Sequence, residues 1–232
     1  MFNGKVIIVA GAAGNVGSAV ARLLASRGAR VAVIDALAPP LSAVVGSLEQ
    51  PDRHLAIPDV DLTDPAAAAA MVAHTVATLG ALHGVATTVG GFAMGNLANT
   101  NLAAWDAMFS LNVKTTWNIY RAAVPALRAA GGGSLVGIGS AAGLRGTSQV
   151  APYAATKSAV MRLTESLADE LRPDRIRVNA VLPTTIDTPQ NRAAMPDADR
   201  SRWVTPAEVG EAMLFLLSDA ASGISGALLP VG

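Results

Sequence analysis

The sequence predicts an α/β fold built on a doubly wound parallel sheet, with helices on both faces in three layers. Short apolar segments alternate with longer helical patterns along the chain, which is typical of repeated β-α-β units. A glycine-rich turn joins the first apolar segment to the first helix, and polar side chains follow several predicted strands. Because no linker interrupts the pattern, we expect residues 1–232 to form a single domain.

The predicted strands are short apolar runs bounded by turn residues. They span residues 5–9, 30–34, 54–58, 82–87, 134–139, 176–181 and 227–230. Helical patterns lie between them, at residues 18–27, 64–79, 102–130, 151–171 and 205–218. The alanine-rich run after Thr63 and Asp64 follows a helix-start signal, so we interpret it as an ordinary helix rather than a low-complexity segment.

Glycines mark the turn between the strand at 5–9 and the helix at 18–27. Gly11 would permit the tight turn, Gly14 the close approach of a phosphate, and Gly17 close packing of helix on strand. The helix N-terminus adds unpaired N–H groups and a positive dipole end, so the turn predicts a Rossmann-type dinucleotide site. The alternative is a glycine-rich turn that binds nothing.

Asp35 ends the second predicted strand, twenty-four residues after Gly11. A carboxylate there can bond the ribose hydroxyls of an adenosine and would repel a 2′-phosphate. The neighbours Ala12, Ala13, Ala36 and Leu37 supply no cation for such a phosphate. NAD is therefore favoured over NADP, unless Asp35 merely caps the loop before residues 39–40.

Tyr153, Lys157 and Ser140 form a predicted proton-delivery set. Residues four apart lie on one face of a helix, so the Lys157 ammonium is expected near the Tyr153 phenol. A nearby cation would lower the phenol pKa from about 10 and make Tyr153 a usable acid/base. Ser140, thirteen residues upstream at the end of a predicted strand, could hold a substrate oxygen beside the phenol. Such pairs also arise by chance on surface helices, so the other motifs are needed to support this interpretation.

Together these motifs resemble the short-chain dehydrogenase/reductase family over nearly the whole chain. The resemblance implies that Asn112 completes an Asn-Ser-Tyr-Lys tetrad and that Asp61 and Leu62 flank the adenine. The sequence departs from the family pattern at residues 87–90, at Pro183-Thr184 and at Asn15, which replaces a glycine. Asn tolerates left-handed backbone better than most residues, so we expect the turn to form.

The resemblance implies hydride transfer between a nicotinamide and a carbonyl or secondary alcohol, with Tyr153 as the acid/base. Lys157 would bond the nicotinamide ribose, and Asn112 would help to position Lys157 through water. The catalytic set would be Ser140, Tyr153, Lys157 and Asn112. We expect the cofactor to contact Gly11, Ala13, Gly14, Asn15, Val16, Gly17, Asp35, Asp61, Leu62, Thr88, Gly90, Tyr153, Lys157, Pro183, Ile186 and Thr188.

Two other functions stay open. Residues 182–199 and 90–96 are similar to quinonoid dihydropteridine reductases, although those enzymes typically lack the serine that stands here at Ser140. A pterin-like substrate is therefore an alternative. The other is a non-catalytic NAD-sensing protein, which would not need the tetrad. The resemblance also implies a homodimer or homotetramer, built mainly from the helices at 102–130 and 151–171.

Several aromatic and methionine side chains lie on the predicted helices and loops around the expected site. We expect core or subunit packing for Trp105, Phe109 and Trp117. Met94, Met195 and Trp203 flank the expected pocket, where packing is at least as good an interpretation as substrate contact. The segment 189–202 is short for a substrate lid, which favours an open or partner-completed site.

Composition excludes several other classes of function. The chain has 17 basic and 17 acidic side chains and no basic stripe, which argues against nucleic acid and anionic membranes as partners. It has no cysteine, hence neither disulfides nor thiolate metal sites. His54, His74 and His83 are dispersed, so we expect no metal site and interpret them as strand or helix-surface residues. No segment has the pattern of a membrane span or signal peptide, which predicts a cytoplasmic protein.

Overall fold

The computed structural model describes residues 1–36 and 38–232, with the side chains of residues 38–40 left out. In this part of the chain, seven parallel strands form one sheet in the order β3-β2-β1-β4-β5-β6-β7. The order reverses between β1 and β4, as the doubly wound fold requires, and places a ligand-binding crevice at the carboxyl ends of these strands. The strands are β1 Val6–Ala10, β2 Arg30–Ile34, β3 Leu55–Ile57, β4 Gly84–Thr87, β5 Gly133–Ile138, β6 Ile176–Pro183 and β7 Leu228–Val231.

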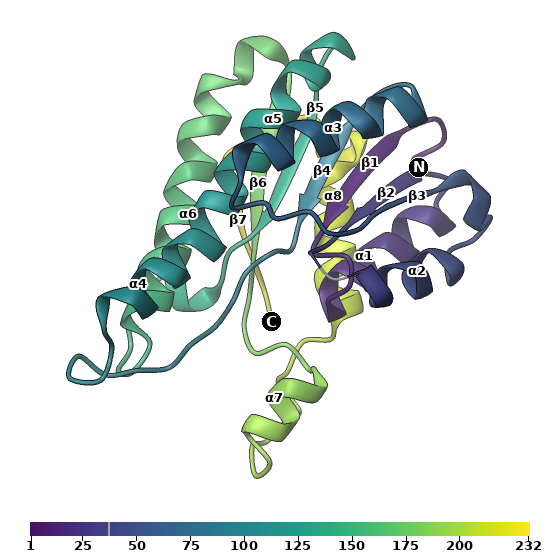
Figure 1. Cartoon of the computed structure of the whole chain (residues 1–232). Coiled ribbons are helices and arrows are strands. Elements are labelled where there is room, and N and C mark those ends of the chain that lie inside the picture. The colour runs from purple at the N-terminus through teal and green to yellow at the C-terminus, as the bar shows by residue number, and fades with distance from the viewer. Residues whose placement is uncertain (37) are drawn as a thin grey trace.

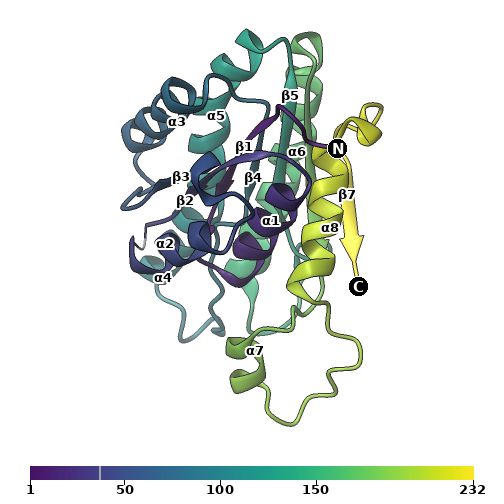
Figure 2. The same cartoon turned by 90° about the vertical axis from the view of Figure 1, so that its right-hand side faces the viewer.

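Helices cover both faces of the sheet, so the expected fold class is confirmed (Figures 1 and 2). One core lies under α1 Asn15–Ser26, α2 Ala38–Gly46 and α8 Pro206–Leu217. The other lies under α3 Pro65–Leu79, α5 Thr115–Ala129 and α6 Ala151–Glu170. Two shorter helices, α4 Leu102–Phe109 and α7 Pro189–Ala194, lie toward the carboxyl end of the sheet (Figure 1). The sequence did not predict α2 or α7.

Side-chain caps explain where several helices begin. The Asp64 carboxylate accepts a hydrogen bond from the Ala66 N–H at 2.8 Å, as expected at the start of α3. Thr205 and Glu208 form a reciprocal capping box at the start of α8. These caps satisfy backbone donors that the helices themselves leave unpaired.

The helical stretch expected at residues 102–130 forms without a break over residues 102–129, but its centre is not α-helical. A π-helical turn, Ser110–Lys114, joins α4 to α5. Two hydroxyls bond back to carbonyls across this turn, Thr115 to Leu111 at 2.6 Å and Thr116 to Asn112 at 3.0 Å. The apolar pattern is the same in either helix type, whereas the π-helical turn changes which residues face the sheet.

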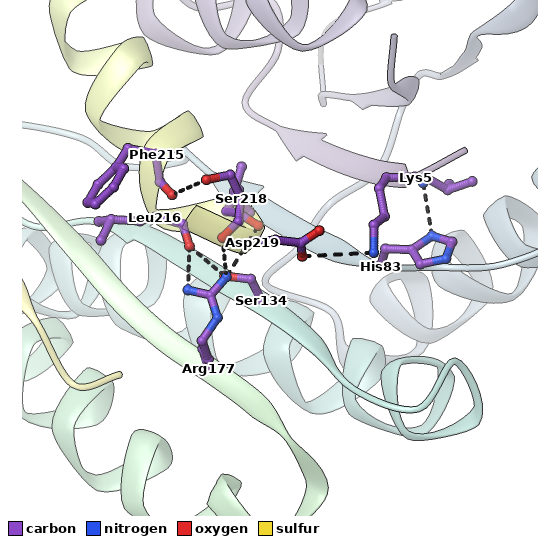
Figure 3. A network of polar contacts seen from close by, with 10 residues as sticks. Lys5, His83, Ser134, Arg177, Phe215, Leu216, Ser218 and Asp219 are labelled. Atoms are coloured by element: carbon purple, nitrogen blue, oxygen red, sulfur yellow. Dashed lines mark hydrogen bonds and ion pairs between the residues drawn. The ribbon is translucent and has the colours of Figure 1, made fainter. Parts of the chain in front are cut away.

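A polar network closes the amino edge of the sheet, opposite the crevice (Figure 3). The Arg177 guanidinium donates to the carbonyls of Leu216 at 2.6 Å and Ser218 at 3.0 Å, at the C-terminus of α8. Ser134 donates to the same Leu216 carbonyl at 3.0 Å. The cation therefore satisfies and neutralises a helix C-terminus, a structural role.

Two of the three histidines, His54 and His83, lie at this amino edge just before strands, whereas His74 is exposed on the surface of α3 as expected. His83 precedes β4, and its Nδ1 accepts the Val6 N–H at 3.0 Å. His54 precedes β3, and its Nδ1 accepts the Val31 N–H at 3.1 Å. Within residues 1–36 and 38–232, no group of His, Cys, Asp or Glu side chains could hold a metal ion. Over the same residues, no helix has both the length and the apolar content that a membrane crossing needs.

Candidate functional site

The glycine turn after β1 has the expected geometry at Gly11 and Gly17. Gly11 has a φ of +78°, which favours glycine, and a Cβ there would lie 2.7 Å from the Thr88 Oγ1. A Cβ at Gly17 would overlap the Gly11 carbonyl, so α1 packs closely at this glycine, against the turn rather than against the strand that the sequence predicted. Gly14 is the N-cap residue of α1. No side chain in the described structure caps this helix end, which leaves its backbone donors available to a ligand.

Asn15 does not use the left-handed backbone that the sequence suggested. It is the first residue of α1, and it is absent from the described non-glycine residues with positive φ. Its side-chain amide instead donates to the Gln190 Oε1 at 3.0 Å, which joins the turn to α7. Asn replaces glycine at this position without strain because the position is helical.

Asp35 lies beside the turn, at the carboxyl end of β2. Its Oδ2 accepts the Ala13 N–H at 2.9 Å. It shares a cavity with Asp61 and Leu62, and the described residues that line this cavity include no lysine or arginine. Asp61 is held by the Thr63 N–H and Oγ1, both at 2.8 Å, and these hydrogen bonds lower the pKa of its carboxyl. Leu37, another uncharged neighbour of Asp35 in the sequence, lies outside the described residues.

Thr88 ties this cavity to the next strand. Its hydroxyl donates to the Ala10 carbonyl at 3.0 Å and lies 3.2 Å from the Gly11 carbonyl. The family usually has asparagine here, and the threonine holds the glycine turn against β4 through these contacts. The threonine at this position therefore links the ends of β1 and β4.

Ser140, Tyr153 and Lys157 line one cavity, although they come from the end of β5 and from α6. The Lys157 Nζ lies 5.8 Å from the centroid of the Tyr153 ring and donates to the Ile138 carbonyl at 3.0 Å. The Ser140 Oγ accepts the Ala142 N–H at 3.2 Å. The structure therefore brings together the predicted proton-delivery set.

The electrostatics of this set differ from the expectation. Burial raises the pKa of Tyr153 above its usual value, and only the hydrogen bond with Ser140 opposes the rise. Burial also lowers the pKa of Lys157 to about 8. In the protein without cofactor, desolvation of the phenolate therefore sets the direction of the Tyr153 pKa shift, and this direction is opposite to the expected lowering by Lys157.

Asn112 lies in the π-helical turn and holds the loop after β4. Its Oδ1 accepts the Gly91 N–H at 3.0 Å, and its Nδ2 donates to the Gly91 carbonyl at 3.1 Å. The same Nδ2 donates to the Thr156 Oγ1 at 3.2 Å, one residue before Lys157. The side chain thus links the loop to α6, whereas its expected link to Lys157 through water stays a prediction.

Phe92 lines the same cavity and was missed as a site residue. Its ring meets that of Tyr153 edge to face, with centroids 4.9 Å apart and an interplanar angle of 80°. A large aromatic residue directly after Gly90 and Gly91 was the available signal. The sequence does not show which way such a ring points.

The remaining predicted residues divide into two groups. Val16, Pro183, Ile186 and Thr188 line the cavity that holds Tyr153, and Gly90 lines both cavities. Met94, Met195 and Trp203 are not among the described residues that line either cavity.

Three aromatic side chains on α4 and α5 are 39–43% exposed: Trp105, Phe109 and Trp117. The expectation that they pack in the core is therefore wrong, and subunit packing stays a prediction.

Comparison with known proteins agrees with this geometry. A family model described as enoyl-(acyl carrier protein) reductase matches residues 11–232. The chain is 34% identical over 227 residues to a 3-alpha-(or 20-beta)-hydroxysteroid dehydrogenase of Mycobacterium tuberculosis, covering 97% of this chain and 86% of the relative. An uncharacterized NAD-dependent oxidoreductase of the same species is 32% identical over 261 residues, covering 99% and 95%.

A solved structure supports the same assignment. A short-chain type dehydrogenase/reductase from Mycobacterium ulcerans superposes with a TM-score of 0.93 at 30% sequence identity, covering 99% of this chain and 89% of that one. Fold, strand order and site geometry therefore lead to one conclusion. This chain is an oxidoreductase that belongs to the short-chain dehydrogenase/reductase family.

Proposed function

We propose that this enzyme transfers a hydride between NAD(H) and a carbonyl or secondary alcohol, with Tyr153 as the acid/base. One observation carries the proposal: Ser140, Tyr153 and Lys157 line a cavity that also contains the glycine turn. A phenol and a hydroxyl beside a dinucleotide site are suited to proton exchange at a substrate oxygen. The hydroxysteroid dehydrogenase among the relatives is consistent with this chemistry.

The residues present fit a dinucleotide. The uncapped N-terminus of α1 supplies donors for a pyrophosphate, and at Gly14 a Cβ would have only the Gly11 carbonyl oxygen within 4 Å, at 3.2 Å. Asp35 and Asp61 border the cavity in which an adenosine would lie. When bound, the nicotinamide supplies or accepts the hydride.

The side chains would handle the proton. The Ser140 and Tyr153 hydroxyls would together hold the substrate oxygen. Because burial raises the Tyr153 pKa, the phenol starts protonated and is ready to donate to a carbonyl oxygen. Lys157 would bond the nicotinamide ribose, and the Ile138 carbonyl fixes the direction of its ammonium. Asn112 would act by positioning the loop and α6.

Asp35 supports NAD as the preferred cofactor. A 2′-phosphate beside this carboxylate would be repelled, and the described lining of the cavity offers no cation to compensate. Titration with NADH and NADPH should show tighter binding of NADH. The variant Asp35→Ala should narrow the difference between the NADH and NADPH affinities. Equal affinities of the unmodified protein for the two cofactors would refute the preference for NAD.

A substrate panel tests the reaction itself. We expect turnover of ketones or secondary alcohols with NADH or NAD and weaker turnover of quinonoid dihydropterin. Ser140→Ala should lower kcat for a ketone severely, since a lost oxyanion donor costs about 2–4 kcal/mol, with little effect on NADH binding. A nearly silent Ser140→Ala with good dihydropterin turnover would favour a pterin reductase. Binding of NADH without turnover of any substrate would favour a sensor.

A second copy of the chain is the proposed partner. Leu102 is 80% exposed, and Trp105, Phe109 and Trp117 are 39–43% exposed along α4 and α5. Large apolar side chains gathered on neighbouring turns are typical of a protein interface. A homodimer or homotetramer through this region would bury them.

A further inference from the structure

Phe92 is an exposed aromatic side chain at the functional site. The side chain follows β4, is 59% exposed, and makes its ring contact with Tyr153. A large apolar side chain left in solvent next to a polar reaction centre loses the free energy that burial would give. The exposed surface of this ring is therefore available to a bound molecule.

The loop that carries Phe92 is held at both ends. Asn112 makes two hydrogen bonds to the Gly91 backbone, and a Cβ at Gly91 would lie 2.5 Å from the Leu111 side chain. Farther along, the Gly95 N–H donates to the Gln149 carbonyl at 2.8 Å, just before α6. The backbone on both sides of Phe92 is thus tied to the helices that carry Asn112 and Tyr153.

The surroundings of the ring are neutral. Among the described residues that line this cavity, Lys157 carries the only charged side chain, and its Nζ donates to the Ile138 carbonyl. Apart from the Lys157 ammonium, a charged group next to the reacting carbon would therefore find no charged side chain in the described lining of this cavity.

We propose that Phe92 determines specificity, by selecting neutral substrates that carry an apolar ring next to the reacting carbon. A substrate oxygen held by Tyr153 places its substituents beside the partner ring of that tyrosine. A rigid ring covers an aromatic surface without losing internal rotations, whereas an acyclic chain must give up several. The proposal rests on the proposed function, because it assumes that the substrate oxygen lies at Tyr153.

The test compares cyclohexyl methyl ketone, whose ring lies next to the carbonyl carbon, with 2-octanone, which has the same number of carbon atoms. We expect the wild-type kcat/KM ratio to favour the ring, and Phe92→Leu to lower that ratio about 5–10-fold, the worth of a good aromatic contact. Phe92→Tyr keeps a ring and should keep the preference. Leu97→Ala is the control on the same loop, since Leu97 is 99% exposed and absent from the described cavity lining.

An unchanged ratio in Phe92→Leu would overturn the proposal. Calorimetric binding of the same two ketones to the NADH complex gives a readout that needs no turnover. A ring preference in binding that Phe92→Leu removes, without turnover of either ketone, would contradict the proposed function and support the role of Phe92. Turnover of both ketones with no preference in rate or binding would support the proposed function and overturn the role of Phe92.

Discussion

Replacing Lys157 with methionine should stabilise the protein without cofactor at neutral pH. Lys157 is 4% exposed, and burial lowers its pKa from 10.5 to about 8. At about 1.4 kcal/mol per pKa unit, keeping the ammonium charged in this site costs on the order of 3 kcal/mol. Lys157→Met also loses the hydrogen bond to the Ile138 carbonyl, which lowers the free energy of unfolding by about 1 kcal/mol. The net increase in the free energy of unfolding is therefore about 2 kcal/mol.

The gain should depend on pH in a defined way. Because the folded protein has the lower Lys157 pKa, the unfolded chain binds more protons between pH 8 and 10.5. The contribution of Lys157 to the free energy of unfolding of the wild type therefore rises as the pH increases from 8 to 10.5. The advantage of Lys157→Met should be complete below pH 8 and should diminish as the pH approaches 10.5.

Urea denaturation without cofactor, at neutral pH and at pH near 10, measures both effects. Lys114→Met is the matched control, because Lys114 is exposed and its replacement should change the free energy of unfolding by less than about 0.5 kcal/mol. A Lys157→Met variant that is no more stable than wild type at neutral pH would refute the reasoning. The stabilised variant should also lose activity, the expected cost of a charged group kept for function.

Three further predictions concern the fold and the assembly. The Tyr120 hydroxyl is buried with no hydrogen-bond partner among the described residues, so Tyr120→Phe should raise the free energy of unfolding by about 1 kcal/mol in urea; a clear loss would contradict this. His83 accepts the Val6 N–H, and burial, with Lys5 and Arg30 nearby, lowers its pKa, so the unfolded chain binds more protons and stability should fall as the pH drops below about 6.5. Thermal melts of His83→Gln should lose most of that dependence, and an unchanged acid slope would exclude this histidine as its source. Trp117→Glu should reduce the oligomer mass in light scattering, and an intact oligomer would move the interface elsewhere.

Most of the site could be predicted because parallel strands bring their carboxyl ends to one edge. Gly11, Asp35 and Ser140 each follow a strand, and the α/β alternation alone is enough to bring them together. The helical spacing of Tyr153 and Lys157 then predicts that both face the same cavity, as they do. These inferences need only chain order and side-chain period.

Other features depend on three-dimensional surroundings that no local pattern encodes. The π-helical turn around Asn112 does not follow from apolar spacing, which is the same in either helix type. The direction of the Tyr153 pKa shift depends on how much water the folded chain removes, which sequence spacing does not report. The contact between Phe92 and Tyr153 joins two segments far apart in the chain, and Asn112 bonds the Gly91 backbone beside it.

The most direct test of the account is the effect of Tyr153→Phe on turnover and on cofactor binding. The change removes one hydroxyl and keeps the ring that contacts Phe92. Loss of a positioned general acid lowers a rate by about 10²–10⁴-fold. We expect kcat for the preferred ketone to fall by about this factor, while calorimetry shows NADH bound nearly as tightly as by wild type. Full activity of Tyr153→Phe on the same ketone would contradict the assignment of Tyr153 as the proton donor.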